Sequence, residues 1–540
     1  MEAPDAIVIG AGPNGLVAAN VLADAGWSVL VLEANDAPGG AVRTEQVTAP
    51  GYRNDLFSAF FPMTAASPVI AELDLGHYGL SWTHAPRVIA HPRPGAPATL
   101  LSRDVAETAR SLERSASGDG DRYRRVFDQW REISTPFMNA LLRPFPPIRS
   151  ASALVRAAGV AGSLDLARLA LLSVRQMTEE LFEGDSAALL FAGNALHADL
   201  TPDASGSALI GWMLVCLGQQ YGFPVPVGGA GAITAALVAR ARARNVELQC
   251  GQLVSRVNVK NGRVRGVTTA DGTFIRSCVV LADCDVTSLM IDMVGLDELP
   301  PRYRRGIRRF QRSSSTFKID WALSSPVPWS DPDVTGAGTV HIADSLDELT
   351  ITSAQIAMRR IPDKPFLLVG QMTTADPTRS PPGTESLWAY THVPQHPTLD
   401  AGNEQISGDW TESDIAKFAE RMEQRIEAHA PGFASRILAR HVMSPPDLQH
   451  ANRNLIGGDI SGGTAQLHQQ LVFRPLNGFA RAETPIKSLY LASASAHPGG
   501  AVHGACGANA ARAAILHHPT RRITTLFKTR TSDTAGGVHG

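Results

Sequence analysis

A glycine-rich turn near the start of the chain constrains its fold more than any other feature. Gly10-Ala11-Gly12-Pro13-Asn14-Gly15 fits the pattern G-x-G-x-x-G. The turn follows an apolar run at 5–9 and opens a helical pattern at 13–25; a second apolar run at 28–32 then ends at Glu33. Strand, turn, helix, strand and acid in this order predict a Rossmann-type βαβ unit that binds a dinucleotide.

Each position in this unit has a physical reason. Gly10 permits a tight turn, Gly12 lets a pyrophosphate approach the backbone, and Gly15 lets the helix pack closely on the strand. Pro13 is tolerated in the first helical turn, where its missing N–H costs little. The helix N-terminus offers free N–H groups to the phosphates. Glu33 is placed to bind the ribose hydroxyls and disfavours a ligand with a 2′-phosphate.

A glycine pair and an arginine follow the acid. Gly39, Gly40 and Arg43 come shortly after Glu33. They could contact the pyrophosphate from its other side, because a guanidinium pairs well with phosphate oxygens. An ordinary Pro-Gly-Gly turn after a strand is the alternative interpretation.

A second glycine-rich connection lies far along the chain, at 493–507, between a predicted strand at 489–492 and a predicted helix at 509–516. Its small residues, Gly499 and Gly500 among them, allow the backbone to approach a ligand closely, and the helix N-terminus can stabilise negative charge on that ligand.

These motifs together resemble the family of FAD enzymes that includes amine oxidases and bacterial phytoene desaturases, and most of the chain resembles its phytoene desaturase-related branch. The segments 226–232, 264–272 and 498–507 also carry the resemblance. The resemblance implies FAD as cofactor, with its flavin half at Gly499, Gly500 and Val502, where the helix N-terminus can stabilise negative charge at N1/O2 of the reduced ring. It also implies a β-meander over the nucleotide-binding sheet, with the backbone at Val254 contacting the adenine.

The same meander is predicted independently of the resemblance. Segments at 254–260, 263–270 and 273–276 are separated by Asn-Gly and Asp-Gly, which are favoured hairpin turns. The expected fold class is α/β, with a Rossmann-like FAD-binding domain that carries this insertion and a discontinuous α+β substrate domain. The FAD-binding domain is expected to comprise 1–61, 226–296 and 478–518, the substrate domain 62–225 and 297–477, and a disordered tail 519–540.

Composition narrows the function classes. The net charge of −2 gives no reason to expect nucleic acid as a partner. Five cysteines without a C-x-x-C pair fit a reducing, cytoplasmic compartment and argue against a disulfide reductase. The histidines show no metal-ligand spacing, so no metal is expected. No apolar run is long enough to cross a bilayer, and the first strand follows Met1 too closely for a signal peptide.

Two basic stretches leave alternatives open. A helical pattern at 151–177 with spaced arginines is typical either of a buried amphipathic helix pair or of a helix on a membrane surface. The arginines at 302–312 indicate either a solvated basic face or contact with anionic lipid. A peripheral membrane contact and a homo-oligomer both stay open as partners. Strands are also expected at 324–329 and near Leu367, Leu387 and Val442, and a helix at 410–430.

No catalytic residue is assigned from the sequence. His197 either lines the substrate cavity or is a core histidine, and His497 and His503 act either as acid–base groups or in loop hydrogen bonds. Amine oxidases usually carry an acid just after the last strand and aromatic residues in front of the flavin; Ser493 follows the strand here, and no Tyr or Trp lies in the loop beyond it.

The expected function is that of an FAD oxidoreductase that transfers hydride from a lipophilic substrate, an isoprenoid or an acyl chain, to flavin N5. A redox-neutral flavin isomerase and a flavin-bearing partner protein with weak catalysis are the alternatives. The substrate and the electron acceptor stay open.

Overall fold

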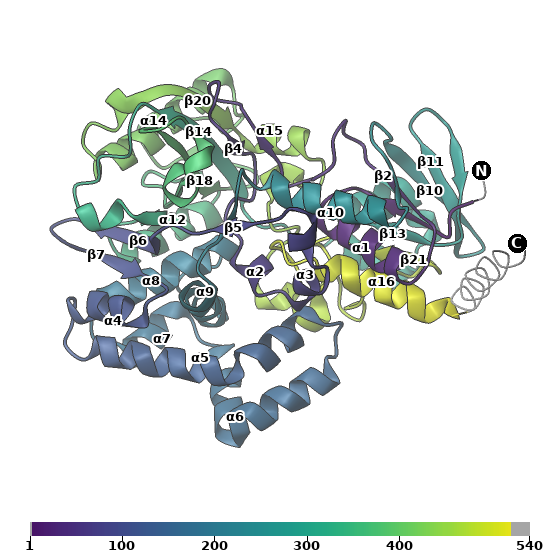
Figure 1. The fold of residues 1–540 in the computed structure, drawn as a ribbon, viewed down its shortest axis with the longest axis horizontal. Coiled ribbons are helices and arrows are strands. Elements are labelled where there is room, and N and C mark those ends of the chain that lie inside the picture. Colours follow the sequence, from purple (N-terminus) through teal and green to yellow (C-terminus); the bar gives the residue numbers. More distant parts are fainter. Residues whose placement is uncertain (1–2, 520–540) are drawn as a thin grey trace, which may run out of the picture.

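The computed structural model describes residues 3–519, so the predicted tail lies outside the described residues from 520 onward. Two sheets dominate the molecule and lie side by side (Figure 1). The smaller one has five parallel strands in the order β21-β13-β1-β2-β9. These strands are β1 (Ala6–Ile9), β2 (Val29–Leu32), β9 (Glu247–Gln249), β13 (Val280–Ala282) and β21 (Leu489–Leu491).

Both faces of this sheet are covered, and its strands other than the edge strand β9 are apolar, as expected of strands buried on both faces. Ala6 and Val8 of β1 pack toward α1 (Pro13–Asp24), α10 (Gly231–Ala243) and α16 (Ala505–His517). Ile7 and Ile9 pack instead against the meander. Segments distant in the sequence thus form one parallel sheet, whose carboxyl-terminal edge is where α/β proteins bind their ligands.

The meander has the predicted three strands, β10 (Val254–Lys260), β11 (Arg263–Thr269) and β12 (Phe274–Arg276). Asn261 and Gly262 have φ of 54° and 67°, as their two-residue turn requires. At the second turn only Gly272 has a positive φ, of 89°. Thr269 there accepts from the backbone N–H of Gly272, so this connection is wider than the predicted two-residue hairpin.

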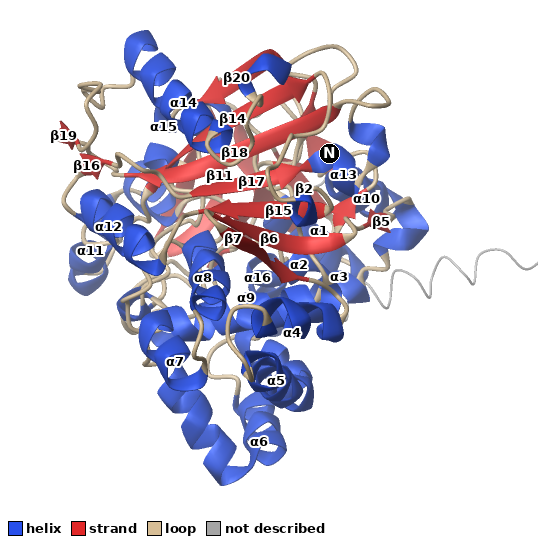
Figure 2. Ribbon diagram, turned by 90° about the vertical axis from the view of Figure 1, so that its left-hand side faces the viewer, coloured by secondary structure: helices blue, strands red, loops and turns tan. Residues whose placement is uncertain are grey.

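The larger sheet has seven strands in the order β20-β14-β18-β17-β15-β6-β7. Its β15–β6 pair is parallel and its other pairs are antiparallel. One face packs on α14 (Glu412–Glu427) and the other faces α8 (Asp185–Ala195) and α9 (Ser207–Tyr221) (Figure 2). The strands are β6 (Arg87–Arg93), β7 (Ala96–Leu101), β14 (Ser315–Leu323), β15 (Ala337–Ile342), β17 (Leu367–Gln371), β18 (Glu385–Val393) and β20 (Ile437–Met443).

The strands expected near Leu367, Leu387 and Val442 are therefore confirmed as β17, β18 and β20, whereas the strand expected at 324–329 is wrong. That segment is irregular because Pro326 and Pro328 lack the N–H groups that a strand ladder needs. The residues that pair with neighbouring strands lie just before this segment, in β14. The predicted helix at 410–430 is confirmed as α14.

The helical pattern at 151–177 belongs to a pair of helices, as one of its two interpretations predicted, but the pair is only partly buried. It forms two helices, α6 (Ile148–Leu169) and α7 (Val174–Leu181), because Ser173 begins a new helix with a capping box to Gln176. Gly159 breaks α6 with a φ of 68°. α6 extends away from the body beyond α5 (Asp119–Leu142), and Ser150 is its one buried residue (Figures 1 and 2). Leu154, Ala158, Leu166 and Leu169 of α6 are partly buried against the core, and α7 buries Val174, Met177 and Thr178, so the buried-pair interpretation holds in part.

No helix within residues 3–519 combines the length and the apolar character needed to cross a membrane.

Candidate functional site

The N-terminal turn is as tight as its glycines predict. Gly10 has a φ of 93°, and its N–H donates to Leu32 at 2.8 Å. A Cβ on Gly15 would lie 2.1 Å from the carbonyl oxygen of Gly10. Helix α1 therefore starts directly against the end of β1, with its free N–H groups at the edge of the sheet.

Glu33 closes one side of this turn. Its Oε2 accepts from the backbone N–H of Ala11 at 2.7 Å and its Oε1 from that of Asn35 at 2.9 Å. The carbonyl of Glu33 also accepts from Gln252 at 2.7 Å. This contact brings the connection before β10, and hence the start of that strand at Val254, next to the acid.

The two glycine turns lie directly against one another. The N–H of Gly39 donates to Ala11 at 2.9 Å, and a Cβ on Gly40 would lie 2.9 Å from the Cα of Gly12. Arg43 follows and places its guanidinium over the ring of Phe57, 5.5 Å from its centroid. The packing on Gly12 explains the glycine pair better than an ordinary turn does.

The C-terminal glycine loop reaches the same place from the other end of the fold. The hydroxyl of Ser67 donates to the carbonyl of His503 at 2.7 Å and holds the loop in place. A Cβ on Gly507 would lie 1.9 Å from the carbonyl oxygen of Asn14, so α16 begins in contact with the start of α1. Two helix N-termini thus meet at one site.

A cavity of about 470 Å³ connects these elements with the larger sheet. The predicted cofactor residues that line it are Gly12, Pro13, Asn14, Gly40, Gly500 and Val502. The others, Gly10, Gly15, Glu33, Gly39, Arg43, Val254 and Gly499, lie outside its lining. The far end of the cavity is lined by Phe60, His197, Leu209, Met213, Phe223 and Trp388.

A buried guanidinium beside the glycine turns fits a pyrophosphate. Nε of Arg43, a residue outside the cavity lining, is buried and has no hydrogen-bond partner within residues 3–519. Buried polar groups are normally paired, so a free guanidinium N–H beside two glycine turns fits a phosphate ligand. Gly12 and Gly40 both line the cavity here, and a Cβ on either would clash with the protein, 2.6 Å from Oδ2 of Asp283 and 2.9 Å from the Cα of Gly12, respectively.

The sequence profile of the family described as flavin containing amine oxidoreductase matches residues 14–391. The chain belongs to this family. It is 29% identical to the mouse (Mus musculus) pyridine nucleotide-disulfide oxidoreductase domain-containing protein 2, over 94% of this chain and 92% of that one. It is 24% identical to a phytoene desaturase (lycopene-forming) of Pseudescherichia vulneris, over 94% and 98%.

Solved structures share the fold. An oxidoreductase from Methanosarcina mazei superposes with a TM-score of 0.60 at 16% identity, over 94% of this chain and 99% of that one. The chain is therefore a flavin-dependent oxidoreductase related to phytoene desaturases, as its motifs predicted.

Asp283, which no sequence motif indicated, lies at the centre of the N-terminal glycine turn. It follows β13 directly, and its Oδ2 accepts from the backbone N–H of Gly15 at 2.8 Å. Burial, together with the charge of Glu33, raises the pKa of Asp283 to about 7, although the hydrogen bond from Gly15 opposes this shift. Its position at the carboxyl end of a parallel strand was the available signal.

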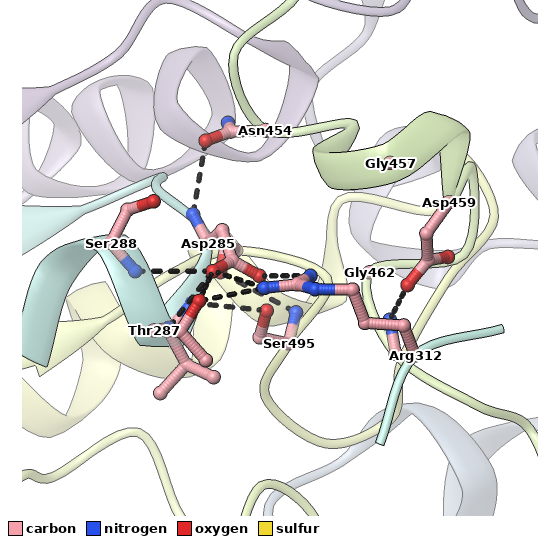
Figure 3. A network of polar contacts seen from close by, with 12 residues as sticks. Asp285, Thr287, Ser288, Arg312, Asn454, Gly457, Asp459, Gly462 and Ser495 are labelled. Carbon is pink, nitrogen blue, oxygen red and sulfur yellow. Dashed lines mark hydrogen bonds and ion pairs between the residues drawn. The ribbon is translucent and has the colours of Figure 1, made fainter. Parts of the chain in front are cut away.

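A buried ion pair, Asp285–Arg312, joins the two sheets beside this site (Figure 3). Nη1 of Arg312 lies 2.9 Å from Oδ2 of Asp285. The neighbouring Val286 donates its N–H to the hydroxyl of Ser495 in the C-terminal loop, and Asn454 accepts from the N–H of Asp285. Arg312 is thus an internal cross-link and no part of a basic face, which corrects its interpretation from the sequence.

The two histidines of the C-terminal loop, His497 and His503, form hydrogen bonds with the backbone. Nδ1 of His503 accepts from the backbone N–H of Ala505 at 3.0 Å, and Nε2 of His497 donates to the carbonyl of Arg143 at 3.1 Å. Burial lowers the pKa of each to about 4, so both are neutral at pH near 7. His503 lines the cavity, whereas His497 does not.

Proposed function

We propose that this chain is an FAD-dependent oxidoreductase that dehydrogenates a lipophilic substrate, an isoprenoid or an acyl chain. The observation that carries the proposal is the continuity of the cavity. It runs from the two glycine turns and the C-terminal loop to an end between α9, which contributes an apolar wall, and the larger sheet. Glu33 beside the turn supports a ligand with a free ribose, as in FAD.

The far walls of the cavity suit an apolar chain. α9 presents Leu209, Ile210, Met213 and Leu214 to it, at the spacing of one helix face. Phe60 closes the side next to Trp388, with ring centroids 6.0 Å apart. The relative named phytoene desaturase, after an isoprenoid, supports the same substrate class.

When bound, FAD would supply a hydride acceptor at N5. The chain's own residues would hold both partners and exclude water. The N-terminus of α16 directs free N–H groups toward the loop at 499–504, where they favour negative charge. The apolar walls keep the substrate end dry, which strengthens these interactions.

The projecting helix α6 offers a route for such a substrate, and we propose that it docks on an anionic bilayer. Val160 and Leu164 are 77% and 67% exposed. Arg149 and Arg156 have no carboxylate within ion-pair distance in the described part of the chain. Leu142, at the end of the preceding helix α5, lines the cavity, so the base of the projection adjoins the substrate site.

Identification of the released cofactor and anaerobic mixing test the proposed function. The purified protein should absorb near roughly 450 nm and release FAD on denaturation. Lasting bleaching of the flavin by an isoprenoid or acyl substrate, with a desaturated product, is the expected result. Turnover with the flavin still oxidised would indicate an isomerase instead, and protein that never binds flavin would overturn the proposal.

A further inference from the structure

The larger sheet presents a polar face to the cavity. On β14, Thr316, Lys318 and Asp320 alternate with Phe317, Ile319 and Trp321. The apolar set packs toward α14, and Thr316 and Lys318 line the cavity. A site for a pure hydrocarbon would not need this face, because each buried polar group costs free energy unless it is paired.

The charges on this face are already neutralised. Lys318 forms a buried ion pair with Asp320, its neighbour on the same side of β14. His197, at the other side of the cavity, is kept neutral because burial lowers its pKa to about 3. The substrate end of the cavity therefore has little net charge with which to recognise an ion.

Thr339 on β15 has a hydroxyl without a partner. The residue is 1% exposed, lines the cavity, and its Oγ1 has no hydrogen-bond partner within residues 3–519. Its cross-strand neighbour is Gly370, which carries no side chain, and the indole of Trp388 lies over that glycine. The hydroxyl thus lies beside an aromatic surface that also lines the cavity.

A histidine pair adds a second donor. Nε2 of His197 lies 2.8 Å from Nε2 of His341, which is two residues after Thr339 on the same face of β15. Nδ1 of His341 is unpartnered and lies 2.4 Å from the place of a Cβ on Gly193. At Nδ1 an unpaired lone pair costs less free energy than an N–H without an acceptor. We therefore assign the proton of His341 to Nε2. His197 then accepts at Nε2 and carries its own proton on Nδ1.

We propose that this end of the cavity binds a lipophilic substrate through an uncharged carbonyl oxygen, as in a ketone or an ester, held by Thr339 and His197 beside Trp388. The proposal rests on the proposed function, because it specifies the substrate of the same cavity. Two neutral donors among aromatic walls favour a carbonyl over both a hydrocarbon and a carboxylate. Trp388 does not compete for the oxygen, since its Nε1 donates to Met372.

The test compares ligands of one chain length on the FAD-loaded protein: tridecane, methyl undecyl ketone and tridecanoate. Affinity is measured from tryptophan fluorescence and from the flavin spectrum. We expect the ketone to bind at least about tenfold more tightly than either other ligand. Thr339→Val and His197→Phe should each reduce this preference toward unity, and Thr339→Ser should keep it.

Thr99→Val is the matched control. Thr99 is also fully buried with an unpartnered hydroxyl, but it does not line the cavity, so its replacement should leave the ketone preference intact. Equal binding of ketone and alkane, tighter binding of the acid, or no binding of any of the three would overturn the proposal. Flavin bleaching by a hydrocarbon without ketone preference would refute this inference alone; ketone preference without bleaching by any substrate would refute the proposed function alone.

Discussion

Gly12 and Gly40, from two different turns, approach so closely that a Cβ on Gly40 would lie 2.9 Å from the Cα of Gly12. Both glycines line the end of the cavity where we place the pyrophosphate. A side chain at Gly40 would therefore push the two turns apart and disturb the fold and the cofactor site together.

Gly40→Ala should abolish flavin retention. Gly40 has a φ of 52°, so alanine adds backbone strain of about 1–2 kcal/mol as well as the clash with Gly12. Gly262→Ala is the control, because Gly262 has a φ of 67° and open space around its Cβ position. The flavin-to-protein absorbance ratio checks the prediction: both variants should lose stability, and only Gly40→Ala should lose flavin. Equal flavin content in the two would contradict it.

Arg43→Ala should weaken FAD binding by roughly ten- to a hundredfold, because it removes a charged donor whose Nε has no protein partner. Arg43→Lys should restore only part of the affinity, since an ammonium lacks the planar donor fork. Equilibrium dialysis of FAD against the flavin-free protein measures the effect. Arg110→Ala, at an exposed arginine on α4 (Val105–Glu113), controls for the loss of charge. Unchanged affinity in Arg43→Ala would remove the role given to this residue.

Asp285→Asn should destabilise the protein by about 3–5 kcal/mol, because it leaves Arg312 without its carboxylate next to the C-terminal loop. Asp121→Asn breaks an exposed pair with Arg124 and should cost less than about 1 kcal/mol. Urea unfolding measures both. A loss below that of the exposed control would show that the cross-link is not needed.

The Asp285–Arg312 pair should also make the stability of the fold depend on pH. Burial raises the pKa of Asp285, but the hydrogen bonds and charge of Arg312 outweigh burial, so the net shift is downward. The stabilisation is therefore present above the unfolded value of about 3.9 and is lost as the pH falls through the folded pKa. The difference in unfolding free energy between wild type and Asp285→Asn should shrink in that acid range.

Asp283 should change the stability of the fold with pH in the opposite direction. Its folded pKa of about 7 lies above the value for an unfolded aspartate, so it stabilises the fold below the unfolded pKa and this contribution is lost as the pH rises through about 7. Asp283→Asn should remove a decline in stability on the order of a few kcal/mol between about pH 4 and pH 7. Urea unfolding across that range is the measurement, with Asp271→Asn at an exposed turn as control. A slope unchanged by Asp283→Asn would contradict the assignment.

Replacing Arg149 and Arg156 by glutamate should reduce binding to anionic vesicles at least about tenfold, because each basic residue near such a surface contributes about 1 kcal/mol. Val160→Ser with Leu164→Ser should reduce it as well. Ile351→Ser removes another exposed apolar side chain, 56% exposed, on a different element, α12 (Leu346–Ala357), and should have no effect. Co-sedimentation decides the question, and retention of binding by both double variants would exclude α6 as the docking element.

Local patterns predicted the βαβ unit and the meander, because a turn, a strand and a helix start depend on neighbouring residues. The Gly12–Gly40 contact was foreseeable in kind, since two glycine turns on one ligand must approach each other. The role of Arg312 was not foreseeable, because its partner Asp285 lies after β13, 27 residues earlier in the chain, and the neighbouring arginines suggested a basic surface. The alternation on β14 is visible in the sequence, but only the packing of α14 decides which side faces the cavity.

The position of β21 at the edge of the five-stranded sheet has a consequence for biogenesis. β21 pairs with β13, yet the ribosome makes it only after the whole seven-stranded sheet. At synthesis rates of about 5–20 residues per second, the nucleotide turn emerges tens of seconds before the loop that completes the site. A flavin bound before β21 is made would contact only half of its site. Stable flavin binding and completion of the parallel sheet must therefore both occur late and nearly together. In a stalled nascent chain, the unpaired edge of β13 would be open to pairing with other chains.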